Sequence, residues 1–361
     1  MAWIINNNIW THEFLEKEFT WEWDTETDVL NVRVENRFLN LFDFKDAPQG
    51  VKIIDLSCNK LSEINLKNLP LSVKTINLSW NQLFFFSLEN IPQTLEKLDL
   101  SYNLLEEIDI KGLSCVFHLN LESNNLNHIN LRNLPQNFYE LNLEHNDLET
   151  ITLDLLPRNL RSLDLSYNKF TILDLTRDLP PNLETFRLDS NPLEKINLTD
   201  LPQTIQILSL KHNQLKEINL KVLPKKLLIL TLDYNQLTEI NLKDLPQSVF
   251  SLSISGNEFK EINLDDIPLT LKTFALFNSS GKIIGQRPLT CTILGLPEII
   301  DLSHLSLSLD DCYICHMNEE DTKLKVYTLK CHLTHIYHQE CLQLWINTGK
   351  PKECVVCNSP F

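Results

Sequence analysis

Short apolar–polar–apolar segments recur along most of the chain, and each is followed at a fixed distance by an asparagine. The segment reads Leu-x-Leu-x-x-Asn-x-Leu, and its asparagine advances by 22 residues, apart from one step of 21 and one of 23. Alternation with a period of two predicts a short strand in every copy, with its leucines on one face. A sequence period of this length predicts a solenoid of stacked coils. The repeated asparagines are Asn59, Asn81, Asn103, Asn124, Asn146, Asn168, Asn191, Asn213, Asn235 and Asn257.

Each copy also contains a second apolar pair, such as Ile108/Ile110, followed by a Leu-Pro or Ile-Pro step. Proline donates no backbone hydrogen bond, so it fits an irregular outer side better than a strand ladder. A single coil can bury its leucines only against the next coil, which predicts one continuous core. An inward asparagine at the turn after the strand is expected to hydrogen-bond the backbone of adjacent coils.

The repeat becomes degenerate at both ends, as expected of capping copies. Extrapolation backwards places a first coil at Val32–Val34, with Arg37 in the asparagine position. Extrapolation forwards places a last coil at Phe274–Leu276, which loses its asparagine near Ser279. Residues 1–28 are expected to form a helix or an irregular cap over the first coil, whose apolar side chains would be Trp3, Trp10, Trp21 and Trp23.

These features resemble the leucine-rich-repeat family over residues 29–285. The resemblance implies an α/β-type repeat solenoid, a horseshoe with short parallel strands on its concave face. Residues 286–311 are apolar enough to pack on the last coil as a C-terminal cap or linker. The Leu-Pro-x-x-Leu spacing also resembles the repeats of secreted bacterial ligase effectors, but their catalytic-cysteine domain has no counterpart here.

Residues between the inward leucines are expected to line the concave face and to bind an unidentified protein substrate. Aromatic residues often precede the repeated asparagine, and exposed aromatics are typical anchors of protein interfaces. The candidate substrate-binding residues are Trp80, Tyr102, His145, Tyr167, His212 and Tyr234. These rings could instead stack on one another and bind nothing. Acidic members of the face, such as Glu122, Glu144 and Asp189, favour a partner with a basic patch, or they serve only solubility.

The net charge of −16 argues against nucleic acid as a partner, because phosphate binding needs clustered Lys and Arg. The N-terminal residues mix tryptophans with acidic residues, unlike a signal peptide, and no long apolar run predicts a membrane span. We therefore expect an intracellular, cytoplasmic protein. Cysteines that cluster in a reducing compartment favour metal binding over disulfides.

Six of the nine cysteines lie between Cys312 and Cys357. Two Cys-x-x-Cys pairs bracket a Cys-x3-His-x2-His-x2-Cys segment, which gives eight nitrogen and sulfur donors. Eight such donors suit two tetrahedral Zn²⁺ ions. A module of about fifty residues cannot build a sufficient apolar core, so zinc would hold it together. The ligand candidates are Cys312, Cys315, Cys331, His335, His338, Cys341, Cys354 and Cys357.

This constellation resembles the RING-H2 finger and defines a domain at residues 312–361. The resemblance implies that ligands pair in alternation. One zinc would take Cys312, Cys315, His338 and Cys341, and the other would take Cys331, His335, Cys354 and Cys357. The resemblance also implies an E3 ubiquitin-protein ligase that binds a ubiquitin-charged conjugating enzyme (E2) and passes ubiquitin to a substrate lysine, with no covalent intermediate on the RING.

The residues that match the family's E2 contacts are Ile314, Trp345 and Val355. Two positions depart from the family pattern: Val355 stands where proline is common, and Asn358 stands where a basic residue is common. These departures keep a non-catalytic adaptor with a RING-like docking module as the alternative. A third class, a cysteine-nucleophile ligase, would need a reactive thiol among Cys58, Cys115 and Cys291, and none has a recognisable acid or base beside it.

Overall fold

The computed structural model divides into two compact units, Met1–Leu294 and Gly295–Phe361. The structure describes residues 4–6, 9–13, 19–24, 26–34, 38–39, 44, 47, 50–88, 91–111, 113, 115–132, 134–175, 179–279, 281–285, 291–294, 326–328 and 336–338. Most of the described residues belong to the first unit, which contains the repeats.

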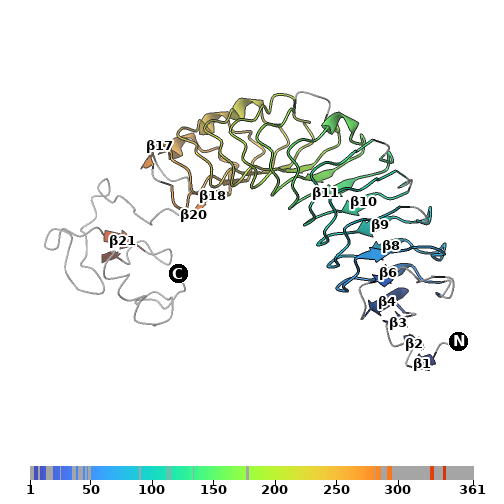
Figure 1. The fold of residues 1–361 in the computed structure, drawn as a ribbon. Coiled ribbons are helices and arrows are strands. Elements are labelled where there is room, and N and C mark those ends of the chain that lie inside the picture. Colours follow the sequence, from blue (N-terminus) through green and yellow to red (C-terminus); the bar gives the residue numbers. More distant parts are fainter. Residues whose placement is uncertain are drawn as a thin grey trace. The chain divides into compact units, whose positions relative to one another are not determined.

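A single sheet of 16 strands runs through the first unit. Its strands follow the inner side of the stacked coils in Figure 1, in chain order from blue to orange. The parallel strands are β4 (Val29–Val34), β6 (Ile53–Asp55), β8 (Thr75–Asn77), β9 (Lys97–Asp99), β10 (His118–Asn120), β11 (Glu140–Asn142), β12 (Ser162–Asp164), β13 (Thr185–Arg187), β14 (Ile207–Ser209), β15 (Ile229–Thr231), β16 (Ser251–Ser253), β18 (Thr273–Ala275) and β20 (Thr292–Leu294).

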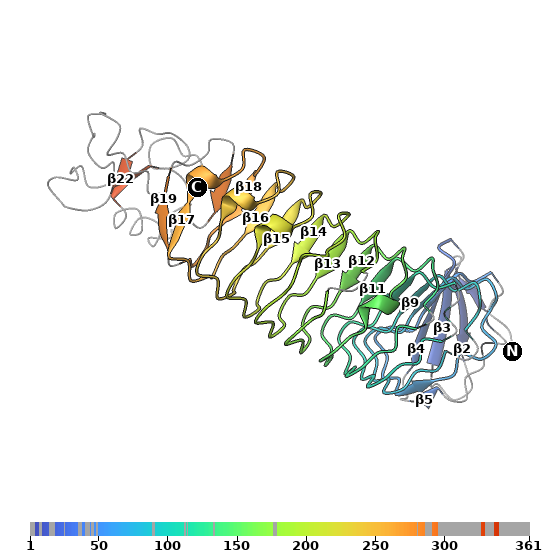
Figure 2. The same ribbon diagram turned by 90° about the horizontal axis from the view of Figure 1, so that it is seen from above.

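The repeat period sets the register of the sheet, because equivalent residues of successive coils lie directly opposite one another. Leu141 of β11 pairs with Leu119 of β10 and with Leu163 of β12. All three leucines are buried, and the flanking residues of each strand point outward in the expected alternation. The predicted continuous core of stacked leucines is therefore confirmed, and Figure 2 shows the coils following one another in a single row.

The outer side of the coils is built from turns rather than α-helices. Among the described residues it contains the 3₁₀ helices η2 (Leu153–Leu155), η3 (Leu220–Val222), η4 (Leu242–Asp244) and η5 (Leu264–Asp266). The repeated proline then accepts a turn hydrogen bond, as from Val73 N–H to Pro70 C=O at 3.1 Å. A coil of about 22 residues with a proline at this point leaves room only for short 3₁₀ turns. The helical half of the expected α/β architecture is thus absent from the part of the chain that the structure describes.

For the N-terminal segment we expected a helix or an irregular cap over the first coil, and the structure has strands there. The segment forms three antiparallel strands, β1 (Ile4–Asn6), β2 (Ile9–Glu13) and β3 (Phe19–Asp24), and β3 pairs with the first coil strand β4. Pairing with β3 covers the edge that β4 would otherwise expose, which protects it from other chains.

The register of the first coil is also corrected. Leu30, rather than Val32, lies opposite Ile54 and takes the buried strand position, two residues earlier than the repeat period predicts. The hairpin turn before β4 explains the shift, because the Asp24 side chain accepts hydrogen bonds from Glu26 N–H and from the Thr27 hydroxyl. That turn, and not the repeat period, decides where β4 begins.

The forward extrapolation agrees with the structure, because β18 contains Phe274 and adds a further coil to the sheet. Strand β20 follows it, so the sheet continues nine residues beyond residue 285, and Ile293 is buried as its apolar character predicts. Two small parallel pairs lie at the ends of the unit: β5 (Phe38–Leu39) with β7 (Glu63–Ile64), and β17 (Glu261–Asn263) with β19 (Lys282–Ile284).

The second unit contains one described pair of strands. β21 (Val326–Thr328) and β22 (Ile336–His338) are antiparallel, with Val326 opposite His338. The chain between these strands includes the predicted ligands Cys331 and His335, which lie outside the described residues.

Candidate functional site

The turn after each strand is held by the repeated asparagine. The Asn168 amide donates to Leu143 C=O of the preceding coil at 2.9 Å and to two carbonyls of its own turn. Its side-chain oxygen accepts from Leu148 N–H at 3.0 Å. The same pattern recurs at the other buried repeat asparagines, such as Asn103 and Asn235. The predicted hydrogen bonds from asparagine to adjacent coils are therefore confirmed.

The residue before each asparagine adopts a left-handed backbone conformation. Its φ is close to +55°, as at Tyr102 and Tyr167, although such values are uncommon for residues other than glycine. The backbone is held in this conformation from two sides. The asparagine side chain binds the turn, and the residue's own N–H donates to the next coil, as from Tyr167 N–H to Asp189 C=O at 2.7 Å. The side chain at this position therefore points away from the core.

The six candidate substrate-binding residues all occupy this position. They form three stacked pairs: Trp80 on Tyr102, His145 on Tyr167, and His212 on Tyr234. The ring centroids in these pairs are 4.1, 4.2 and 4.4 Å apart, and the rings are nearly parallel.

Small residues separate the ring pairs, since the same position holds Cys58, Ser123, Ser190 and Gly256 in the other coils. Gly256 is required by its neighbour, because a Cβ there would lie 2.6 Å from the Tyr234 ring. The stacking that the sequence left open is thus present. Trp80 still exposes 57% of its surface, so stacking does not exclude a binding role.

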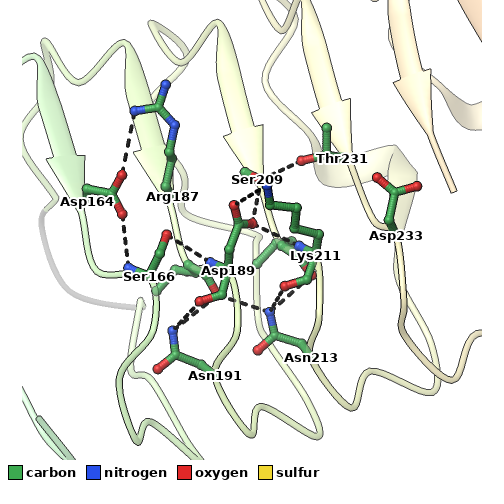
Figure 3. Close-up of polar contacts among 12 residues, drawn as sticks. Asp164, Ser166, Arg187, Asp189, Asn191, Ser209, Lys211, Asn213, Thr231 and Asp233 are labelled. Carbon is green, nitrogen blue, oxygen red and sulfur yellow. Dashed lines mark hydrogen bonds and ion pairs between the residues drawn. The ribbon is translucent and has the colours of Figure 1, made fainter. Parts of the chain in front are cut away.

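The inner face carries charged and polar side chains that are tied to one another across the strands, as Figure 3 shows. Arg187 lies 3.6 Å from Asp164, and Lys211 lies 3.5 Å from Asp189. Asp189 also accepts hydrogen bonds from the Ser209 hydroxyl and from Lys211 N–H. Each of these two buried carboxylates therefore has a cationic partner inside the fold, which weakens its attraction for a basic protein partner.

Glu144 is the carboxylate of this face that differs most from its neighbours. Burial raises the pKa of Glu144, and the nearby charges of Asp164 and Glu122 raise this pKa further. Glu122 accepts a hydrogen bond from the Tyr102 hydroxyl at 2.7 Å, and Glu140 pairs with His118 at 2.7 Å. Three carboxylates, those of Glu122, Glu144 and Asp164, are therefore close enough on the inner face to affect one another's charge.

Sequence reasoning missed three exposed apolar residues, Phe84, Phe85 and Leu104. Phe84 and Phe85 stand three and four residues after Asn81, and Leu104 directly follows Asn103. Their signal was present in the repeat alignment, because other coils mostly place polar residues at these positions. The repeat must be aligned on its asparagines before such departures can be seen.

The side chains of the eight predicted zinc ligands lie outside the described residues, as do Ile314, Trp345 and Val355. Among the described residues, no group of three or more His, Cys, Asp and Glu side chains could hold a metal ion. Of the remaining cysteines, Cys58 and Cys115 are exposed and Cys291 is buried.

Comparison with known proteins identifies the repeats. A profile described as Leucine Rich Repeat matches residues 159–179. The coil at residues 159–179 thus matches the leucine-rich-repeat pattern, and the other coils share its period. Among solved structures, YopM from Yersinia enterocolitica WA-314 is similar, with a TM-score of 0.54 and 25% identity, over 69% of this chain and 56% of YopM. A leucine-rich-repeat protein from Leptospira interrogans has a TM-score of 0.55 and 24% identity, over 65% of this chain and 69% of that protein. These likenesses show the fold of the leucine-rich-repeat unit.

One curated relative has a named activity. The E3 ubiquitin-protein ligase LAP of Myxoma virus (strain Lausanne) is 34% identical over 73 residues, which make up 19% of this chain and 34% of the viral protein. The chain thus spans about a third of the length of this relative. In the part of the chain that the structure describes, no helix is long and apolar enough to cross a membrane.

Proposed function

We propose that the chain is a RING-type E3 ubiquitin-protein ligase in which the leucine-rich-repeat solenoid binds a protein substrate. The observation that carries the proposal is the spacing of eight cysteine and histidine donors between Cys312 and Cys357. These donors fall within the compact unit Gly295–Phe361, which is separate from the repeats. The similarity to the Myxoma virus ligase supports the same function.

The donor set fits two Zn²⁺ ions, because six thiolates and two imidazoles supply four donors to each tetrahedral site. Cys312, Cys315, His338 and Cys341 would hold one ion, and Cys331, His335, Cys354 and Cys357 would hold the other. Zinc at such closed sites stabilises the fold and leaves no open position for catalysis. A structural zinc site contributes on the order of 10 kcal/mol, so loss of a ligand should unfold the module.

The module itself would supply no nucleophile. Ile314, Trp345 and Val355 would form the surface that binds a ubiquitin-charged E2. Transfer would be accelerated because the thioester is held close to its geometry of attack by the substrate lysine. The solenoid would raise the local concentration of that lysine by binding the protein that carries it.

The test is a ubiquitination assay with the purified full chain, a ubiquitin-activating enzyme, a broad panel of E2 enzymes, ubiquitin and ATP. We expect ubiquitin chains on the protein itself or on an added partner, and two zinc ions per chain by mass spectrometry. The Ile314→Ala and Trp345→Ala variants should lose most of the activity and keep both zinc ions. Ile172→Ala, on the exposed surface of the solenoid, is the matched control and should keep full activity.

Two sequence positions favour a second function, that of a non-catalytic adaptor. Val355 replaces the proline common after the seventh ligand, and Asn358 replaces the basic residue common after the eighth. If no E2 in the panel supports transfer while two zinc ions are bound, the ligase proposal fails and the adaptor is favoured. Restored transfer in an Asn358→Arg variant would instead show that this substitution limits the activity.

A further inference from the structure

Two neighbouring coils carry a cluster of exposed apolar side chains, which we name the aromatic edge: Trp80, Phe84, Phe85, Tyr102 and Leu104. The exposed fractions of Trp80, Phe84 and Phe85 are 57%, 59% and 56%. The backbone joins the two coils at this point, because Leu104 N–H donates to Leu83 C=O at 2.8 Å. Tyr102 stacks on Trp80, and Leu104 lies in the coil next to the one that carries Phe84 and Phe85, so both coils contribute side chains to the aromatic edge.

The repeat fold does not require these residues. The third and fourth positions after the asparagine are polar in the other coils, apart from Ile172. They read Ser62/Glu63, Glu106/Glu107, Asn127/His128, Glu149/Thr150, Thr171/Ile172, Glu194/Lys195, Lys216/Glu217, Thr238/Glu239 and Lys260/Glu261. The core positions beside the aromatic edge are already filled, since Leu83 and Phe86 are buried. Packing of the coil therefore gives no reason for two exposed phenylalanines.

The size of the cluster also distinguishes it from scattered surface residues. Trp80, Phe84 and Phe85 are each more than half exposed and Tyr102 is about one third exposed, so the four rings present roughly 400 Å² of apolar surface. The largest apolar patches on soluble monomers are of about this size, and they are often functional. A stable dimer needs roughly 800 Å² from each partner. Two copies of a chain with a net charge of −16 would also repel each other, so a second copy is a poor occupant.

A pocket of about 480 Å³ adjoins the aromatic edge and spans three coils. Phe85, Leu88 and Ile108 contribute apolar surface to its lining, and Leu88 and Ile108 are otherwise almost completely buried. Its polar lining includes Glu107 and Lys111. The pocket has room for one bulky side chain of a partner, and its lining offers that side chain both apolar and charged groups.

The charges around the pocket select the partner. Lys111 pairs with Asp109 at 3.3 Å, so these two charges largely cancel. Glu106 and Glu107 are exposed, and no ion pair with either is present among the described residues. They occupy in the next coil the positions that Phe84 and Phe85 occupy, and Glu107 lines the same pocket as Phe85. A partner that places an apolar group on the phenylalanines would therefore face two uncompensated carboxylates.

We propose that the aromatic edge and its pocket bind a protein segment in which a bulky apolar residue is flanked by Lys or Arg. Apolar burial would supply most of the affinity, and the pairing of basic residues with Glu106 and Glu107 would supply selectivity and a faster association. The role of this segment as a recognition element of a ligase substrate rests on the proposed function. The binding itself needs neither ubiquitin nor an E2.

The experiment measures the binding of three fluorescein-labelled peptides to the full chain by fluorescence anisotropy. The first peptide combines leucines with lysines, the second combines leucines with glutamates, and the third combines serines with lysines. We expect the leucine–lysine peptide to bind at least about tenfold more tightly than either of the others. Equal binding of the two lysine peptides would mean non-specific charge attraction, and equal binding of the two leucine peptides would remove the role of the carboxylates. Either result overturns the proposal, as does the absence of binding by all three.

Substitutions test whether the leucine–lysine peptide binds at the aromatic edge. Phe84→Ser combined with Phe85→Ser should weaken binding of the leucine–lysine peptide by about tenfold or more. Ile172→Ser, which removes an exposed apolar residue from the equivalent position of another coil, is the matched control and should leave binding unchanged. Glu106→Gln with Glu107→Gln should weaken binding and reduce its dependence on salt. Circular dichroism confirms that each variant is folded.

Unchanged affinity in the folded double phenylalanine variant would overturn the proposal. Failure of the ligase proposal would look different, since peptide binding would persist while no E2 supported ubiquitin transfer.

Discussion

The repeated asparagines hydrogen-bond the backbone of successive coils, and we call this arrangement the asparagine ladder. It offers the sharpest test of how this solenoid is held together. Asn168 is buried and makes four hydrogen bonds: its amide donates to the carbonyls of Leu143, Leu165 and Ser166, and its oxygen accepts from Leu148 N–H. Substitution by alanine removes all four bonds at once. It leaves the leucine core and the strand register untouched.

The free-energy cost of losing these bonds differs among the four backbone groups that Asn168 contacts. The carbonyls of Leu143 and Leu165 each accept a second bond, from Asn146 at 3.1 Å and from Asn191 at 3.0 Å. Leu148 N–H, by contrast, would lose the acceptor that the structure gives it. An unpaired buried N–H costs about 2 kcal/mol, and the lost bonds to shared carbonyls add about 1 kcal/mol. We therefore expect Asn168→Ala to lower the free energy of unfolding by about 3 kcal/mol.

Urea denaturation followed by circular dichroism measures this change. With an m-value of about 3 kcal/mol/M, the midpoint should fall by about 1 M. Hydrogen exchange gives a local readout, because the Leu148 amide should lose protection before the rest of its coil. The matched control is Asn182→Ala, whose amide donates to Arg158 C=O at the surface and which should change stability by less than about 0.5 kcal/mol.

The reasoning would be refuted if Asn168→Ala shifted the midpoint no further than this control. Retained protection of the Leu148 amide would refute it as well, since the ladder would then not be what satisfies that buried group.

Three further substitutions test other parts of the structure, each by thermal unfolding. Because burial and nearby carboxylates raise the pKa of Glu144, its charged form costs stability above that pKa, so Glu144→Gln should raise Tm at neutral pH. The gain in Tm should fade as the pH falls through the raised pKa of Glu144. Glu217→Gln is the control and should show no gain in Tm. Equal effects of the Glu144 and Glu217 substitutions would contradict this account. Gly256→Ala should cost about 1 kcal/mol or more, because it strains a positive φ and displaces the Tyr234 ring; an unchanged Tm would show that the ring yields freely. Ser279→Asn should raise stability by about 1 kcal/mol, because the buried Ser279 hydroxyl has no hydrogen-bond partner among the residues that the structure describes, at a position where other coils place asparagine; a lower Tm would show that the last coil departs from the repeat geometry.

The sequence alone determined the central part of this protein. The coil period fixed which residues lie opposite one another, because successive coils must bury the same leucines. It also predicted the hydrogen bonds of the asparagines, because a buried turn has backbone groups that must be paired. The zinc centre stays a prediction from the spacing of Cys312 to Cys357, with an expected chemistry but no described geometry.

The tertiary structure decided what the period does not control. The hairpin turn at Asp24 shifted the first coil by two residues, because local hydrogen bonds there override the repeat. Whether the aromatic rings stack depended on contacts between side chains 22 residues apart, and the small residues at Ser123 and Ser190 divided the rings into pairs.

The folded coil likewise established that Phe84 and Phe85 are exposed, although the alignment of the repeats already shows that other coils mostly place polar residues at these positions. In sequence, three consecutive phenylalanines look like core, and only Phe86 is buried. The physical reason is that the backbone of a coil turns between its two apolar segments. Adjacent residues in that turn can therefore face either the core or the solvent.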